Sequence, residues 1–421
     1  MRTRRWLTAA LAVIAVGLAA SACSSAPGST ASGGTTLRVS ATASDRPAME
    51  AVIAAFTKAN PSVTIKPEYL DTEPMQAAMR TQLSAGTAWD VLFAWPGNGN
   101  PGALQVLQPN GYLIDLSDRP WAAQIPAGLK PVTQVDGKTY LLPMSFSGIG
   151  AIYNQTALQA VGVKAPATWT ELLAFCAAAK GKGKAAYSLG NQTNWVTQLI
   201  DYALVATTVY AADPDFDAKM KNGSATFAGS PWETAMNKYL EMNQHGCFQK
   251  DPLGTSVEAT DAQVAKGDAV AVVQGTWELG NLKKAAPAGT QFVMEPLPAT
   301  DDTAQTRMPG AASGTFAVNA KTKNKDLALK FIDFMAQPDT MNAWATAGGS
   351  LPAFPNDKFT AGAELAQFVE FQKAGKTVPF MDQLWPNPTV QNVHLTGVQD
   401  MFSGKLKPAQ VLAQMDAAYK K

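Results

Sequence analysis

Residues 137–154 have the sequence GKTYLLPMSFSGIGAIYN, and the rest of the chain is organised around this stretch. Residues 140–142 and 149–153 are apolar, β-branched or aromatic, which is typical of short buried strands. Between them lie a proline and glycines that remove a backbone donor and widen the accessible φ and ψ range. We therefore predict a hinge-like crossing from one sheet to another. An edge strand with a glycine bulge is the alternative.

The first 22 residues have the layout of a secretory signal peptide. Three arginines precede an apolar run over residues 6–20, which is shorter than the ~20 residues that a membrane-spanning helix needs. Ala20, Ser21 and Ala22 then stand directly before Cys23, and this order resembles the lipobox of bacterial lipoproteins, in which that cysteine is lipidated. Cleavage near Ala22 as an ordinary signal peptide is the alternative.

Residues 23–35 are rich in serine, glycine and threonine and poor in apolar side chains. Such a segment cannot bury a core and behaves as a flexible tether. We therefore expect a folded body that is held by its lipid at the outer face of the bacterial cytoplasmic membrane and has no other attachment to the membrane.

The charge balance and the motifs exclude several classes of protein. Of the 34 basic residues, 31 remain once the three arginines of residues 1–22 are removed, and they face 33 acidic residues. This balance provides no basic surface for nucleic acid. The chain has two histidines, His245 and His394, and no HExxH, GxSxG or CxxC motif. We therefore predict no metal centre, catalytic triad or cofactor, and we expect His394 to be a core residue.

From residue 36 onward the chain alternates strand and helix patterns. Strand patterns over residues 37–41, 63–70 and 90–95 are separated by helical patterns over residues 45–60 and 72–86. This order is typical of a parallel α/β sheet. The mature chain of roughly 385 residues exceeds what a single core normally serves, so we expect two lobes.

Loops at the carboxyl ends of parallel strands are the places where ligands of such sheets bind. The loops of residues 42–47, 70–73 and 95–100 are therefore candidates for the site. The first contains Asp45, and the third, within WPGNGNPG at residues 95–102, contains Trp95 and Asn98. An indole can cover the apolar face of a ligand, and an amide can both donate and accept hydrogen bonds. The alternative is that Trp95 is simply the last core residue of its strand.

The same arrangement recurs later in the chain. One strand pattern is followed by Asn191 and Trp195, and the strand pattern of residues 268–275 is followed by Trp277. Tryptophans at three strand ends indicate a cleft for a ligand that has apolar faces.

Two cysteines, Cys176 and Cys247, remain after Cys23 is assigned to a lipid. An exported chain matures under conditions that permit disulfides, so we expect a single bridge between them. The alternative is a buried, apolar Cys176 and a free thiol at Cys247.

The order of several segments resembles a known family across nearly the whole mature chain. The segments are DVLFAWPG, GIGAIYN, VVQGTWELGNL, GTFAVNAKTKNKDLALKFIDFM and VPFMDQLW, which begin at residues 90, 148, 272, 314 and 378. In this order they resemble the extracytoplasmic solute-binding proteins of ABC importers, and among these the sugar-binding group related to maltose-binding protein.

The resemblance implies a periplasmic-binding-protein-like fold of the α/β class, with two hinge-linked lobes and a ligand cleft between them. The N-lobe would comprise residues 36–147 and 311–356, and the C-lobe residues 148–310 and 357–421. The segment GGSLPAFP at residues 348–355 would form a second crossing.

The resemblance also suggests roles for single residues. Trp277 and Trp385 match tryptophans that stack on sugar rings in the maltose-binding relatives, and Trp95 lies at or beside another such position. Ser147 stands where those relatives hold a ligand-binding glutamate. This departure leaves the identity of the sugar open.

The sequence therefore predicts a lipid-anchored, monomeric binding protein that captures an oligosaccharide or disaccharide and delivers it to the permease subunits of an ABC importer. Closure of two lobes would enclose the sugar. Aromatic faces would cover the sugar rings, and polar side chains would satisfy the hydroxyl groups. The candidates for this polar role are Asp45, Asn98, Ser147, Asn191, Gln274 and Glu278.

Two other functions remain as alternatives. A polyamine or a peptide is the alternative solute, although a cationic ligand would require several acids near the tryptophans and the expected cleft loops contain few. A secreted glycoside hydrolase would use two carboxylates across the cleft, and Asp45 and Glu278 are the only pair that we nominate.

Overall fold

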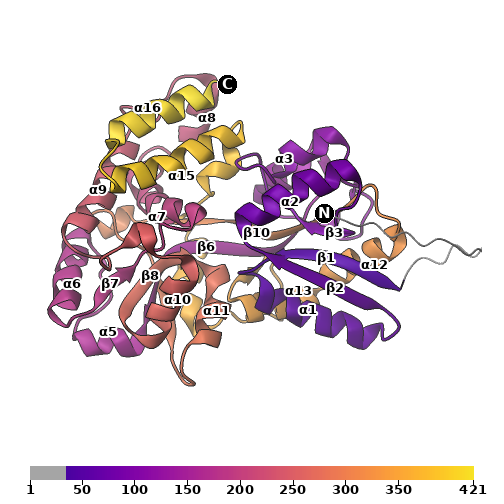
Figure 1. Cartoon of the computed structure of the whole chain (residues 1–421), viewed down its shortest axis with the longest axis horizontal. Coiled ribbons are helices and arrows are strands. Elements are labelled where there is room, and N and C mark those ends of the chain that lie inside the picture. The colour runs from indigo at the N-terminus through magenta and orange to yellow at the C-terminus, as the bar shows by residue number, and fades with distance from the viewer. Residues whose placement is uncertain (1–34) are drawn as a thin grey trace, which may run out of the picture. The chain divides into compact units, whose positions relative to one another are not determined.

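The computed structural model describes residues 35–421. The predicted signal peptide, Cys23 and all but the last residue of the predicted tether lie outside these residues. Within residues 35–421 the chain forms a mixed α/β structure whose main sheet contains ten strands (Figure 1). None of the helices in this part of the chain combines the length and the apolar character needed to cross a membrane.

The main sheet has the strand order β2-β1-β3-β10-β6-β8-β7, with β9 and β11 attached to β6 and with β12 attached to β10. Its strands are β1 (Thr36–Thr42), β2 (Thr64–Leu70), β3 (Val91–Phe93), β6 (Leu142–Asn154), β7 (Ala185–Ser188), β8 (Ala269–Gly275), β9 (Phe292–Glu295), β10 (Met308–Val318), β11 (Leu351–Pro352) and β12 (Thr377–Val378). A separate ribbon consists of β4 (Gln134–Val135) and β5 (Lys138–Thr139).

Helices cover the strands throughout the described chain (Figure 1). Their bounds are α1 (Arg46–Ala59), α2 (Thr72–Ala85), α3 (Leu104–Leu107), α4 (Lys130–Thr133), α5 (Gln155–Val161), α6 (Trp169–Gly181), α7 (Thr197–Thr208), α8 (Phe216–Asn222), α9 (Trp232–Gln244), α10 (Val257–Lys266), α11 (Leu279–Ala285), α12 (Lys325–Met335), α13 (Pro338–Gly348), α14 (Ala366–Lys373), α15 (Pro388–Phe402) and α16 (Pro408–Tyr419).

The first five elements follow the predicted alternation of strands and helices. β1 pairs in parallel with β2 and with β3. α1 buries Met49, Val52 and Phe56, which lie on its expected core face. α2 is followed by Gly86 in the left-handed conformation, which glycine adopts without strain. The parallel sheet predicted for this part of the chain is confirmed.

β6 is a single strand of 13 residues that carries the crossing predicted from residues 137–154. Residues 142–148 pair with β10, whereas residues 149–154 pair with β8 and β9. The expectation of two short strands is therefore wrong, because the strand continues through its proline and glycines. Gly148 serves packing instead, since a Cβ atom there would collide with the ring of Phe368. In Figure 1, β6 and β10 extend between the group of helices that contains α2 and the group that contains α7.

The hydrophobic core is divided near the same point of β6. One cluster, the N-terminal cluster, collects side chains from residues 37–144 and 312–354. Two further clusters, the C-terminal clusters, collect side chains from residues 149–311 and 351–418. β8 contributes side chains to both C-terminal clusters, Val270, Ala271 and Val273 to one and Ala269 and Val272 to the other. The strands β6 and β10 thus pass from one core to another.

The second predicted crossing is also present. Leu351 of β11 lies opposite Phe146 of β6 and belongs to a C-terminal cluster, whereas Phe354 belongs to the N-terminal cluster. The chain therefore passes between the cores at β6, at β10 and again at β11.

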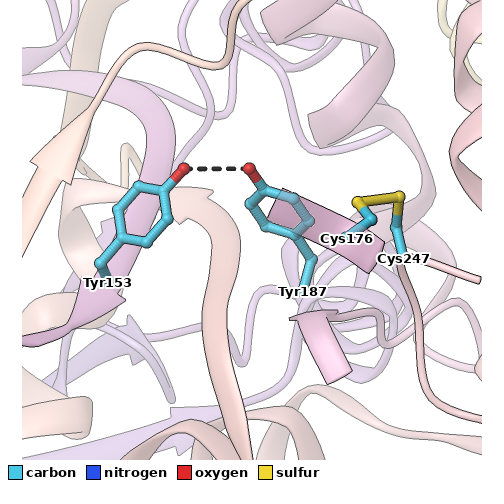
Figure 2. The surroundings of a disulfide bond; sticks show 4 residues. All are labelled: Tyr153, Cys176, Tyr187 and Cys247. Carbon is cyan, nitrogen blue, oxygen red and sulfur yellow. Dashed lines mark hydrogen bonds between the residues drawn. A yellow bond between two sulfur atoms is a disulfide. The ribbon is translucent and has the colours of Figure 1, made fainter. Parts of the chain in front are cut away.

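Cys176 and Cys247 are joined by a disulfide, with their Cα atoms 4.7 Å apart. Cys176 lies on the buried face of α6, and Cys247 follows α9. The carbonyl oxygen of Cys247 accepts a hydrogen bond from the backbone N–H of Tyr187 in β7. Figure 2 shows the bridge beside Tyr187, whose hydroxyl lies 2.9 Å from that of Tyr153. The bridge therefore ties α6 to the segment after α9 in the buried interior.

We expect removal of this bridge to destabilise the protein. The two cysteines are 71 positions apart, and closing a loop of that length restricts the unfolded chain by the equivalent of ~4 kcal/mol. The double variant Cys176→Ala/Cys247→Ala should therefore unfold at a lower denaturant concentration than the wild type. A reductant should shift the wild-type transition and leave the variant's transition in place. Coincident transitions for the oxidised wild type and the variant would contradict this expectation.

Candidate functional site

A cavity of about 240 Å³ is lined by members of both the N-terminal cluster and a C-terminal cluster, such as Phe93 and Leu199. Its wall is built from the loop between β1 and α1, from α2, from β6 and β10, and from α7 and α15. Segments from distant parts of the sequence thus converge on one concave site, which is the usual arrangement of a small-molecule binding site.

The tryptophans predicted from the strand ends, Trp95, Trp195 and Trp277, all line this cavity and are partly buried. The indole of Trp95 lies over Gly102, where a Cβ atom would come within 2.7 Å of the ring. Phe93 packs edge-on against Trp95 with 4.8 Å between the ring centroids. A glycine and a phenylalanine therefore fix the position of this indole.

A glycine and a phenylalanine also fix the position of Trp277. Its indole lies against Gly275, the last residue of β8, and a side chain at that glycine would collide with the ring. The ring of Phe380 packs edge-on against it, 5.9 Å away between centroids. Trp195 lies in the short 3-10 turn Asn194–Val196 before α7. Flat apolar faces from three separate segments therefore border the cavity.

Asp45, the acid predicted from the first loop, is buried at the cavity wall with 8 % of its surface exposed. Its side chain does not cap α1; instead its Oδ2 accepts a hydrogen bond of 2.7 Å from the hydroxyl of Thr42. Burial raises the pKa of Asp45 from 3.8 to about 6; the Thr42 hydrogen bond lowers it, and nearby Glu278 raises it. A ligand that brings hydrogen-bond donors would stabilise the charged form of this carboxyl.

Glu278 lies close to Asp45, but it is not part of the cavity wall. It is 2 % exposed, and its two oxygens accept hydrogen bonds from the hydroxyl of Ser44, at 2.9 Å, and from the side-chain amide of Asn281, at 2.7 Å. Because Ser44 precedes α1 and Glu278 precedes α11, this contact joins elements of the two cores. Both oxygens of Glu278 thus have partners within the chain, and its contact with a ligand stays a prediction.

The sequence of residues 51–373 matches the family described as "Bacterial extracellular solute-binding protein". The chain belongs to this family. The family resemblance inferred from the sequence is therefore confirmed, and the protein is a binding protein and not an enzyme. The alternative of a glycoside hydrolase is thereby set aside.

Several relatives and solved structures are similar to this solute-binding protein over most of its length. The "Multiple sugar-binding protein" of Streptococcus mutans is 21% identical over 340 residues, which are 80% of this chain and 79% of the relative. The structure titled "SBP RafE in complex with raffinose" has a TM-score of 0.76 at 19% identity and covers 92% of this chain and 100% of its own. A sugar transporter structure from Bacillus licheniformis in complex with stachyose has a TM-score of 0.71 at 20% identity, with 91% and 99% covered. The predicted two-lobed α/β fold is confirmed by these likenesses.

Trp385 of this solute-binding protein lies in the core and not at the cavity, with 2 % of its surface exposed. Its ring packs against Tyr202, Phe227 and Trp232, with centroids 5.7 to 6.2 Å away. The 3-10 turn Met381–Leu384 precedes it, so that Asp382 faces the cavity while the indole enters a C-terminal cluster. Trp385 therefore lies apart from the three tryptophans of the cavity wall, and its stacking on a sugar stays a prediction.

His394 occupies the same buried aromatic region. Its ring stacks on Tyr202, and its Nε2 lies 2.9 Å from Oδ2 of Asp201. Both His394 and Asp201 are fully buried. The prediction of a core histidine is confirmed.

The loop of residues 95–102 makes a contact that the sequence did not indicate. The side chain of Asn98 donates to the carbonyl oxygen of Pro386, and its backbone N–H donates to that of Gln383 at 3.3 Å. A side chain at either glycine beside Asn98 would collide with the backbone around Gln383. The glycines therefore let this loop lie flat against the segment before α15. Asn98 serves that contact and does not line the cavity.

Ser147, Asn191 and Gln274 are also buried away from the cavity wall. Oδ1 of Asn191 accepts a hydrogen bond of 3.2 Å from the hydroxyl of Tyr239, and Oε1 of Gln274 accepts one of 2.9 Å from the N–H of Gly275. Ser147 lies within β6, next to the point where the partner strands change. The Ser147 hydroxyl, Asn191 Nδ2 and Gln274 Nε2 have no hydrogen-bond partner among the described residues. The contact of these three side chains with a ligand stays a prediction.

Most polar groups on the cavity wall come from segments to which the sequence analysis assigned no role. They are carried by α2, by α7 and the turn before it, by the turn Met381–Leu384, and by α15. Glu73 is an exception, because it belongs to the loop of residues 70–73 that was expected at the carboxyl end of the second parallel strand. The wall residues of this kind include Glu73, Gln76, Asn194, Gln198, Asp382 and Gln391.

Asp382 is a second buried acid of the wall. Its Oδ2 accepts a hydrogen bond of 3.0 Å from the side-chain amide of Gln391. Burial raises its pKa from 3.8 to about 6, while Tyr202 beside it lowers the pKa. Across residues 35–421, no three histidine, cysteine, aspartate or glutamate side chains are grouped so as to hold a metal ion. The site therefore offers aromatic faces, amides and carboxyls as its binding groups.

We expect Asp45→Asn to stabilise the ligand-free protein at neutral pH. Asparagine can still accept the Thr42 hydrogen bond but carries no charge. Because the pKa of Asp45 is raised to about 6 in the folded state, its ionisation costs up to ~3 kcal/mol of folding free energy above pH 6. This cost disappears as the pH falls from 6 towards 4, since Asp45 is then protonated in both states. The gain of the variant, measured by denaturant unfolding, should shrink over that range.

Asp115→Asn is the matched control for this measurement. A hydrogen bond from Ser117 lowers the pKa of Asp115, as does Lys138, although slight burial opposes them. This variant should therefore give no gain in stability at neutral pH. A gain for Asp45→Asn that stays constant from neutral pH to pH 4 would contradict the role of the buried charge.

Proposed function

We propose that this protein captures a sugar outside the cytoplasm and delivers it to the permease of an ABC importer. The observation that carries this proposal is the convergence of Trp95, Trp195 and Trp277 with several amide side chains on one cavity. Indole faces suit the C–H faces of sugar rings, and amides suit hydroxyl groups because both donate and accept hydrogen bonds. Relatives and structural neighbours named for sugars support the same class of ligand.

The proposed N-lobe comprises residues 36–147 and 311–356, and the proposed C-lobe comprises residues 148–310 and 357–421. The division of the hydrophobic clusters near the middle of β6 supports this boundary. In a binding protein of this design, a ligand that contacts both lobes favours their closed arrangement by its differential contacts. The permease would recognise the closed form, and the protein would act as a monomer.

Two polar contacts are suited to support the closed arrangement. The hydroxyl of Ser44 donates to Glu278, and the side chain of Asn98 donates to the carbonyl oxygen of Pro386. Each joins a residue of the proposed N-lobe to one of the proposed C-lobe. A closed cavity excludes water, so the hydrogen bonds between a sugar and the wall gain in strength.

A thermal-shift screen of sugars can identify the ligand, since a ligand that binds only the folded state raises the melting temperature of the protein.

For the sugar identified in this way, we expect Trp195→Ala and Trp277→Ala each to weaken binding by ~1 to 3 kcal/mol, because each substitution removes an aromatic face from the wall. Isothermal titration calorimetry measures this loss. The control is Phe371→Ala, which removes a partly buried ring of α14 outside the cavity. Wild-type affinity in both tryptophan variants would count against the proposal.

The proposed lipid anchor has a separate test. Cys23→Ala should release the protein from the membrane fraction of an expressing bacterium into the medium or the periplasm, because no lipid can then be attached. Sugar affinity should not change, since Cys23 precedes the described body of residues 35–421. Retention of the variant in the membrane fraction would rule out this mode of anchoring.

A further inference from the structure

Three carboxyl groups line the cavity, on Asp45, Glu73 and Asp382. They come from the loop before α1, from the first turn of α2, and from the turn Met381–Leu384. The described wall contains no lysine, arginine or histidine. The sequence predicted few acids near the tryptophans, so the negative character of the wall is a finding of the structure.

These carboxyl groups form no ion pair within the chain that the structure describes, although His394 lies close enough to Asp382 to lower its pKa. No ion pair between residues 35 and 421 includes Asp45, Glu73 or Asp382. Asp45 receives one hydrogen bond, from Thr42, and has Glu278 as a further acid nearby. A buried carboxylate without a partner cation is costly, and the raised pKa values of Asp45 and Asp382 express that cost.

Beside Glu73, the cavity wall has a further hydrogen-bond acceptor without a donor. Burial raises the pKa of Glu73, as does Asp71, whereas Asn194 beside it lowers the pKa. Oδ1 of Asn194 is buried and accepts no hydrogen bond from any described residue. The carboxylate of Glu73 and the amide oxygen of Asn194 would both be satisfied by a ligand group that donates several hydrogen bonds. An ammonium group supplies three donors and no acceptor.

The tryptophans favour the same kind of group. The face of an indole carries negative electrostatic potential and attracts a cation placed over it. Trp95, Trp195 and Trp277 share the wall with the three carboxyl groups. A ligand carboxylate or phosphate would instead be repelled by those carboxyl groups, and the described wall has no cation to offset the repulsion.

We propose that the solute is a sugar that carries a free ammonium group, an amino sugar or a short glycoside of one, and that the acids of the wall bind this group. The proposal rests on the proposed sugar-binding function and names the class of sugar. Neutral sugars of the same shape would bind more weakly, and acidic sugars would bind most weakly.

The test compares matched sugars by calorimetry: glucosamine with glucose and glucuronate, and the β-1,4-linked disaccharide of glucosamine with cellobiose. We expect glucosamine to bind about tenfold more tightly than glucose, and its disaccharide about tenfold more tightly than cellobiose. Glucuronate should bind most weakly. High salt should reduce this advantage, since it screens the attraction between charges. Equal or weaker binding of the amino sugar, with neutral sugars bound, would overturn this inference and leave the proposed function standing. Failure of every sugar to bind, or binding of spermidine alone, would overturn both.

Variants locate the group that recognises the charge. Glu73→Gln keeps the shape of an exposed side chain at the cavity rim, so this variant should fold. It should reduce affinity for the amino sugar about tenfold and change affinity for its neutral counterpart less than about twofold. Glu370→Gln, an exposed residue of α14 outside the cavity, removes the same charge and should change neither affinity. An equal loss for both sugars in Glu73→Gln would assign Glu73 to a hydroxyl group and overturn its role in recognising charge.

Discussion

The ladder of backbone hydrogen bonds along β6 is the constraint on which the rest of the structure depends. Its first seven residues pair with β10, and the residues after Gly148 pair with β8 and β9. One strand therefore runs through both parts of the main sheet and fixes their relative register. The cavity lies beside this strand, with Ile149 in its wall, so residues from distant parts of the sequence meet there.

Much of the fold could be predicted because local patterns and tertiary structure agree. The alternation of strands and helices up to residue 95 gave the parallel sheet, and the apolar face of α1 was found where its spacing placed it. The crossing at residues 137–154 was also recognised, although as two strands. Proline and glycine usually interrupt a strand, but here Pro143 lies opposite Thr315 within the ladder and Gly148 makes room for Phe368.

Three tryptophans of the site were predicted from strand ends. Trp95 and Trp277 each lie two residues beyond a strand, whereas Trp195 lies seven residues beyond β7 in the turn before α7. All three line the cavity. Trp385 does not, because its direction depends on the turn before it and on the aromatic cluster around Tyr202. Asp45 and Glu73 lie in two loops that were expected at the same edge of the parallel sheet. Asp382 could not be grouped with them from the sequence, because only the assembled fold brings the turn Met381–Leu384 to the cavity.

The chain passes repeatedly between the N-terminal cluster and the C-terminal clusters, and this affects how such a protein can diversify. The N-terminal cluster draws on residues 37–144 and again on residues 312–354, and β6 pairs with strands on both sides of the boundary between the clusters. Neither core is encoded by one uninterrupted stretch of the gene. A single recombination event with a relative would therefore join mismatched halves of a core. New ligand specificity is accordingly expected to arise through substitutions on the cavity wall.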